Sequence, residues 1–141
     1  MYVLHFVLLT RVCRARCRWA ELRTNMHNIN EKVKAMLEGQ EDVKYRHHLG
    51  GAVYVSVTTG YRCVDFRKFF VPDGETEPKP TRTGIALRLR EWEQMPQLIQ
   101  KINDKNPDLA TAFQCYVHDN HLSQIEAMEC RECHPFGPYI L

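Results

Sequence analysis

In residues 49–71, LGGAVYVSVTTGYRCVDFRKFFV, alternate residues would lie on opposite faces of an extended chain. This pattern constrains the fold more than any other in the sequence. One face of the first half would hold Val53, Val55 and Val57. β-Branched and aromatic residues repeating with a period of two are typical of half-buried strands. Gly60 tolerates the positive φ of a tight turn. The stretch therefore predicts two antiparallel strands that bury one face.

A loop, a third strand and a helix are predicted next. Residues 71–81 hold three prolines and a glycine in a polar context, which cannot continue a ladder of backbone hydrogen bonds. Alternation resumes over 84–89, and apolar residues return at helical spacing over 91–104, beginning with Trp92. Pro96 predicts either a kink in this helix or its first turn. The order is typical of an α+β unit in which Trp92 packs in a core or dimer interface rather than on a base.

The region before the first strand is predicted to be an extension with a short amphipathic helix. Apolar residues recur at helical spacing over 26–37, with Asn28 as a cap and Gly39 as a stop. Residues 1–25 join an apolar run to the arginines that follow it, and the run is too short to span a bilayer. A secretory signal or anchor is therefore disfavoured, and no membrane partner is expected. The alternatives are a poorly structured extension, an over-extended gene model that truly starts at Met26, and an extra docked strand.

The formal net charge of +2 conceals opposite imbalances along the 141 residues. Seven Lys/Arg oppose five Asp/Glu in residues 1–43, eleven oppose seven in 44–106, and one opposes five in 107–141. The chain therefore divides into an N-terminal extension at 1–43, a basic central domain at 44–106 and an acidic Cys/His-rich tail at 107–141. The central domain suits an anionic partner if its charge gathers on one face.

Four segments within residues 49–103 occur in an order that marks a family resemblance. They are LGGAVYVSV, VDFRKFF, PDGE and KPTRTGIALRLREWEQM. The set resembles the C-terminal domain of the transcriptional coactivator family called positive cofactor four, or p15. The resemblance implies a curved four-stranded antiparallel sheet followed by a long kinked helix, paired into a two-fold dimer. It also implies a nuclear protein that binds single-stranded or unwound DNA, with the transcription machinery as a candidate partner.

The resemblance also implies which residues contact DNA. In this family a strand arginine, a nearby aromatic residue and basic loop residues carry the binding. The matching positions here are Arg67, Phe70, Lys79 and Arg82. Phe70 stands where the family usually has tryptophan, and Thr83 replaces a loop lysine. The first hairpin lacks the lysine-rich tip of the family, for which Tyr61 and Arg62 could partly substitute.

These residue types fit the chemistry of an unpaired strand. Such a strand exposes phosphates and free base faces, so binding needs cations along its path and aromatic rings for stacking. The alternative interpretation is structural: Arg67 only pairs with Asp65 or another acidic neighbour, and the loop charges are solvated.

Two functions from different classes follow. The first is a non-enzymatic module that binds single-stranded or melted DNA as a transcriptional coactivator or regulator. The second is a dimerisation or protein-interaction module with a zinc-bearing tail and weak or no nucleic-acid binding. A homodimer is expected in either case, because a small sheet covered by one helix has little core of its own. The sequence shows no nucleophile beside a base and no phosphate-binding glycine loop, so no enzymatic activity is expected.

The tail carries cysteine and histidine residues at spacings that permit a metal site. A Cys-x2-Cys pair follows an upstream cysteine and two histidines. The candidate ligands are Cys115, His118 or His121, Cys130 and Cys133. A structural zinc ion would stabilise a tail that has few apolar anchors. Reduced thiols, or a disulfide or redox role, are the alternatives, and the central domain is expected to need no cofactor.

Overall fold

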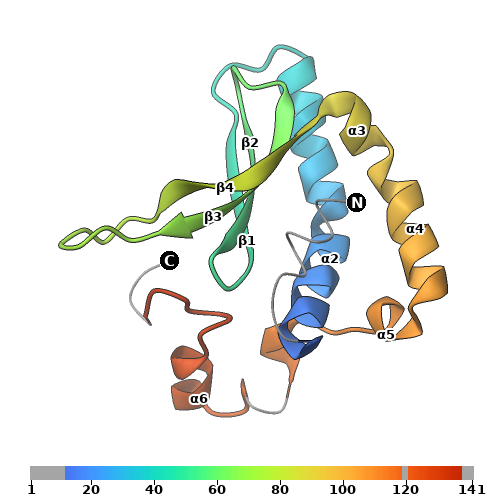
Figure 1. The fold of residues 1–141 in the computed structure, drawn as a ribbon. Helices are drawn as coiled ribbons and strands as arrows, with labels where there is room; N and C mark the ends of the chain where they lie inside the picture. Colours follow the sequence, from blue (N-terminus) through green and yellow to red (C-terminus); the bar gives the residue numbers. More distant parts are fainter. Residues whose placement is uncertain (1–11, 119–120, 138–141) are drawn as a thin grey trace.

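The computed structural model describes residues 12–118 and 121–137, which fold as an α+β structure (Figure 1). A long helix precedes a four-stranded antiparallel sheet, and short helices follow it. The elements are α2 (Val12–Leu37), β1 (Lys44–Gly50), β2 (Val53–Thr58), β3 (Cys63–Phe70), β4 (Lys79–Arg88), α3 (Leu89–Glu93), α4 (Met95–Lys105), α5 (Pro107–Ala110), the 3-10 helix η1 (Cys115–Val117) and α6 (Gln124–Glu129). None of the described helices is both long and apolar enough to cross a membrane.

The sheet has the order β1-β2-β3-β4, and each neighbouring pair is antiparallel. The predicted alternation of β2 is confirmed, because Val53, Val55 and Val57 are all buried. Gly60 has φ 96° in the turn that follows, as predicted. The residue pattern alone missed β1, because its sequence KYRHHLG contains no β-branched residue. The four-stranded sheet agrees with what the family resemblance implies.

Helix α2 is much longer than the helix predicted over 26–37, since it begins at Val12 and has 26 residues. Its apolar stripe continues towards the N-terminus through Leu22 and Trp19, each only 1% exposed. Spacings of three, four and seven residues keep these side chains on the same face as Ile29, which is also buried. The stripe extends the hydrophobic core along α2 to Trp19.

This helix changes the predictions for the N-terminal region. A poorly structured stretch and a docked strand are both wrong for residues 12–25, which are helical, whereas residues 1–11 lie outside the described part of the chain. Asn28 lies inside α2 instead of capping it. The stop at Gly39 is confirmed: this glycine has φ 81°, and its amide donates to the Met36 carbonyl at 3.2 Å.

The hydrophobic core lies between α2, α3 and α4 and the face of the sheet that they cover. Phe66 and Trp92 are buried there with ring centroids 6.1 Å apart. The Trp92 indole donates to Asn30 Oδ1 at 2.8 Å and so ties α3 to α2. The prediction that Trp92 packs in the core is confirmed. Since α2 adds a second helical cover within one chain, the sheet has more core than the argument for a dimer assumed.

Two helices, α3 and α4, take the place of the expected long kinked helix. The break falls at Gln94, and Pro96 lies in the first turn of α4. Proline has no amide hydrogen, and inside a helix its ring would clash with the carbonyl four residues earlier, so a new helix starts here. Of the two alternatives for Pro96, the first turn is confirmed.

The arginines of α2 hold the segment that follows α4. Arg23 donates to three carbonyls at the end of α5, those of Leu109, Ala110 and Ala112, at 2.6–3.0 Å. No following turn of helix provides backbone N–H donors to these carbonyls, so the guanidinium supplies their hydrogen bonds. Arg16 forms a more exposed ion pair with Asp108 at 3.1 Å. The arginine-rich stretch therefore has a structural role in this fold.

Candidate metal centre and candidate nucleic-acid surface

The face of the sheet opposite α2 is open and forms a groove of about 750 Å³. One row of cross-strand partners crosses all four strands, and it consists of Arg46, Ser56, Asp65 and Ala86. The groove is lined by cationic and aromatic side chains as well as acidic ones, among them Lys44, Arg46, Tyr61, Asp65, Arg67, Phe69 and Glu77. Cationic side chains beside rings in a groove are the components that single-strand binding uses.

Arg46 lies over two rings on this open face. Its Cζ atom is 5.4 Å from the Tyr54 ring centroid and 5.1 Å from that of Phe69, and the two rings are 4.8 Å apart. These distances are those of cation–π contacts. Sequence reasoning missed both Arg46 and Phe69 as site residues. Extending the alternation back into β1 would have placed Arg46 beside Ser56 on the open face.

Arg67 lines the groove but is held by neighbours within the sheet. Its Nε and Nη2 donate to the two carboxylate oxygens of Asp65, both at 3.0 Å, and its Nη1 donates to the Thr81 carbonyl at 2.9 Å. The hydrogen bonds that Arg67 donates to the Asp65 carboxylate raise the pKa of Arg67 above its usual value. The structural alternative for Arg67, pairing with Asp65, is therefore what the geometry shows. The side chain keeps 24% exposure in the groove.

Gly84 gives Arg67 the space for this arrangement. A Cβ at Gly84 would lie 2.7 Å from the Phe66 carbonyl oxygen and 2.9 Å from two carbons of the Arg67 side chain. No real side chain tolerates such contacts with backbone. Gly84 is therefore a position where two strands approach too closely for a side chain.

The other predicted DNA contacts lie towards the two ends of β3. Phe70 and Lys79 are cross-strand partners at the start of the β3–β4 hairpin loop, which projects from the sheet (Figure 1). Since alternate residues point to opposite faces, Phe70 faces away from Phe69 and the groove. Lys79 pairs with Glu75 at 3.0 Å.

The remaining three predicted contacts are exposed. Arg82 lies in β4 close to a register irregularity, and Tyr61 and Arg62 lie in the β2–β3 turn. Tyr61 is 69% exposed and lines the groove. The structure therefore brings Tyr61 and Arg67 into the groove, whereas Phe70 and Lys79 lie at the hairpin end of β3.

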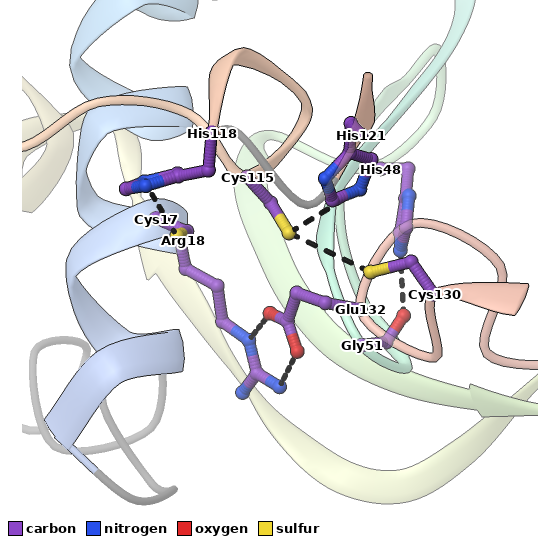
Figure 2. A network of polar contacts seen from close by, with 9 residues as sticks. All are labelled: Cys17, Arg18, His48, Gly51, Cys115, His118, His121, Cys130 and Glu132. Carbon is purple, nitrogen blue, oxygen red and sulfur yellow. Dashed lines mark hydrogen bonds and ion pairs between the residues drawn. The ribbon is translucent and has the colours of Figure 1, made fainter. Parts of the chain in front are cut away.

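The tail gathers four potential metal ligands at one point. The side-chain ligand atoms of Cys115, His121, Cys130 and Cys133 all lie within 4.8 Å of one another. Cys115 Sγ is 3.6 Å from Cys130 Sγ and 3.8 Å from His121 Nε2, and Figure 2 shows these two contacts. His121 Nε2 is 3.2 Å from Cys133 Sγ. This cluster could bind a zinc ion.

His118 lies outside the cluster, which settles the choice that spacing left open. Its Nε2 is 3.7 Å from Cys17 Sγ on α2, as Figure 2 shows. Three residues further on, His121 reaches the cysteines. Cys115, Cys130 and Cys133 are free thiols, as is Cys63.

Burial and mutual proximity oppose ionisation of the thiols. Burial, with the hydrogen bond to Cys130 and the neighbouring sulfur charges, raises the pKa of Cys115 far above its usual value. Burial and the charge of Cys130 raise that of Cys133 to about 11. Burial also acts against ionisation of Cys130, but hydrogen bonds from the Cys133 backbone and the Cys115 thiol outweigh it and lower its pKa. A divalent cation is the natural counter-charge for such thiolates, and its binding would release their protons.

A buried ion pair fastens this cluster to α2. Glu132, inside the Cys-x2-Cys segment, accepts two hydrogen bonds from Arg18, and both residues are only 4% exposed (Figure 2). The Nη2–Oε2 distance is 3.0 Å. Paired geometry of this kind is what allows two charges to be buried together. Sequence reasoning missed the pair, because 114 residues separate its members.

The β1–β2 turn packs against this ion pair. The Gly51 amide donates to the Glu132 carbonyl at 2.8 Å, and His48 Nε2 donates to the Gly51 carbonyl at 2.6 Å. A Cβ at Gly50 would lie 2.4 Å from a Glu132 carboxylate oxygen, and one at Gly51 would lie 2.3 Å from an Arg18 nitrogen. The two glycines are therefore required for the tail to dock on the sheet.

No family model matches the chain, and no solved structure matches it. The resemblance to positive cofactor four therefore rests on the four sequence segments within residues 49–103.

Proposed function

We propose that this chain binds single-stranded or unwound nucleic acid along the open face of its sheet, as a non-enzymatic nuclear module of transcription that resembles positive cofactor four. The observation that carries the proposal is the groove, in which Lys44, Arg46 and Arg67 accompany exposed Tyr61. DNA is the expected nucleic acid, because the resemblance implies it.

The cations of the groove have different roles in this proposal. Lys44 and Arg46 are exposed and can reach phosphates, as can Arg82 on β4. All three nitrogen groups of Arg67 are already hydrogen bonded within the sheet, so it offers the flat face of its guanidinium to a base. Tyr61, beside the start of β3, supplies an exposed ring in the groove, whereas Phe70 faces away from it. The eight residues of β3 cover about 23 Å, enough for several stacked or splayed bases.

Loss of a phosphate contact is expected to weaken binding and to reduce its salt dependence. Arg46→Ala and Arg82→Ala should each lower the slope of log affinity against log salt by about 0.7, the value for one phosphate contact with a single strand. Tyr61→Ala should instead lower affinity by about 5- to 150-fold, corresponding to roughly 1–3 kcal/mol for one stacked base, with the slope unchanged. Fluorescence anisotropy of a labelled oligo-dT strand at several salt concentrations measures both quantities.

The matched control is Lys32→Ala, which removes an exposed cation from α2, on the covered side of the sheet. It should leave affinity and slope unchanged. Equal losses from Lys32→Ala and Arg46→Ala would show that only net charge matters and would refute the groove. Absence of oligo-dT binding at micromolar protein and low salt would refute the proposed function itself.

A second candidate function, assembly through the tail, is favoured by exposed apolar side chains. Five large apolar residues of the tail are each more than half exposed, namely Phe113, Tyr116, Val117, Leu122 and Ile125. Several exposed large apolar side chains within one short segment favour an interaction site. A second copy of the chain is the partner we propose, because an apolar surface can be buried against the same surface of a copy related by a two-fold axis.

Substitution of two of these residues is expected to dissociate the homodimer. The variant Leu122→Ser/Ile125→Ser should sediment as a monomer where the parent chain sediments as a dimer. Both side chains are exposed, so the fold should be retained. A parent chain that is monomeric at all concentrations would refute this candidate without affecting the groove.

A further inference from the structure

The geometry points to one structural zinc ion bound by Cys115, His121, Cys130 and Cys133, which fixes the tail so that it can dock on α2 and the β1–β2 turn. This site does not depend on the proposed nucleic-acid binding. Its ligands come from η1, from the segment before α6 and from the Cys-x2-Cys segment that follows α6.

The spacing of the ligand atoms fits a tetrahedral zinc site. Zn–S bonds of about 2.3 Å and Zn–N bonds of about 2.0–2.1 Å require ligand atoms roughly 3.6–3.8 Å apart around a tetrahedron. The distances from Cys115 Sγ to Cys130 Sγ and His121 Nε2 are 3.6 and 3.8 Å, and the shorter His121–Cys133 contact is 3.2 Å. All four ligand atoms lie within 4.8 Å of one another, which is close enough for one ion to contact them all.

The ligand set indicates a structural rather than a catalytic ion. Three thiolates and one imidazole fill the four positions that zinc prefers, so no position is left for a water or a substrate. Thiolate and imidazole ligands together favour zinc over calcium or magnesium, which bind oxygen. A disulfide accounts for the cluster less well, because it would join two sulfurs and leave the third cysteine and the histidine unexplained.

The part of the tail that carries the ligands has no apolar packing in its described helices. α6 has only six residues and η1 only three, and neither contains a buried residue. Short helices without buried apolar side chains are not stable alone. Yet this tail places Glu132 in a buried ion pair, which requires a defined backbone at the Cys-x2-Cys segment. Cross-linking of three chain segments by zinc provides that definition.

The test is metal content and spectroscopy of the full chain. Protein purified without chelator should contain one zinc per chain by mass spectrometry. Protein refolded with Co²⁺ should show the visible bands of tetrahedral cobalt and the thiolate-to-cobalt charge-transfer band, and added Zn²⁺ should abolish both. Less than one-tenth equivalent of zinc together with no cobalt spectrum would overturn the proposal.

Histidine variants provide a matched pair. His121→Ala should lose the parent cobalt spectrum, whereas His118→Ala should keep it, because His118 lies outside the cluster. His121→Cys should retain zinc and strengthen the charge-transfer band, since it replaces an imidazole by a fourth thiolate. This variant keeps the test decisive if His121→Ala does not fold.

Cysteine variants complete the assignment. Cys133→Ser should bind zinc much more weakly than the parent, while Cys63→Ser on β3 should bind one equivalent as before. An equal spectrum from Cys133→Ser and the parent would overturn the ligand set. A cobalt spectrum of Cys63→Ser that differs from that of the parent chain would overturn the ligand set as well.

Discussion

Replacement of Arg18 by methionine is expected to destabilise the fold by about 3–5 kcal/mol, because it leaves the Glu132 carboxylate buried without a partner. The side chains of both residues are only 5% exposed, so water cannot solvate the remaining charge. Glu132→Leu should have an effect of similar size, since it leaves the Arg18 guanidinium buried without a partner. The free energy of unfolding of the full chain, measured in urea, reports both values.

A double-mutant cycle and an exposed pair provide the controls. Arg18→Met/Glu132→Leu removes both charges and should recover much of the lost stability, because apolar replacements often match a buried ion pair. Arg16→Met breaks the pair with Asp108, whose side chains are 42% and 74% exposed, and should cost less than about 1 kcal/mol. Equal losses from Arg18→Met and Arg16→Met would contradict the burial of the Arg18 pair.

Trp19→Ala is expected to cost about 3–5 kcal/mol, the usual effect of deleting a buried aromatic side chain. Trp19 is 1% exposed, and its indole donates to Asn103 Oδ1 at 2.8 Å, so the substitution removes packing and a link between α2 and α4. Thermal and urea unfolding followed by circular dichroism measure the loss. Leu37→Ala, at the exposed end of the same helix, is the control and should change stability by less than about 1 kcal/mol.

The same experiment bears on where the protein begins. A chain that starts at Met26 would lack Trp19 and Leu22 from the core and Arg18 and Arg23 from the tail contacts. It should therefore show no cooperative unfolding transition. A truncated chain as stable as the parent would contradict the packing of α2 and support the shorter gene model.

The sequence predicted the structural features that depend only on residues close together in the chain. The alternation of β2, the turn at Gly60, the stop at Gly39 and the position of Pro96 all depend on backbone preferences of the residues themselves. β1 was missed because its side chains are mostly polar, and hydrogen bonding to β2 gives it its conformation. The first half of α2 was missed because arginines interrupt its apolar stripe, and their partners lie about 90 or more residues away.

The candidate sites show the same limit. Cysteine spacing revealed three ligands of the metal cluster, but choosing His121 over His118 required the path of the chain between η1 and α6. The groove was only partly predictable: Arg67 and Tyr61 lie in it, whereas Phe69 takes the place expected for Phe70. Phe70 was assigned by its position in the family resemblance alone. Because alternate residues of a strand point to opposite faces, Phe69 and not Phe70 lies on the face of the groove.

The separation of Arg18 from Glu132 also has a consequence for protein synthesis. At about 5–20 residues per second, a ribosome needs roughly 6–23 s to add the 114 residues between them. Until Glu132 has been translated, the guanidinium of Arg18 lacks its carboxylate partner. The sheet can assemble co-translationally, but the last folding step must wait until the chain has emerged past the Cys-x2-Cys segment.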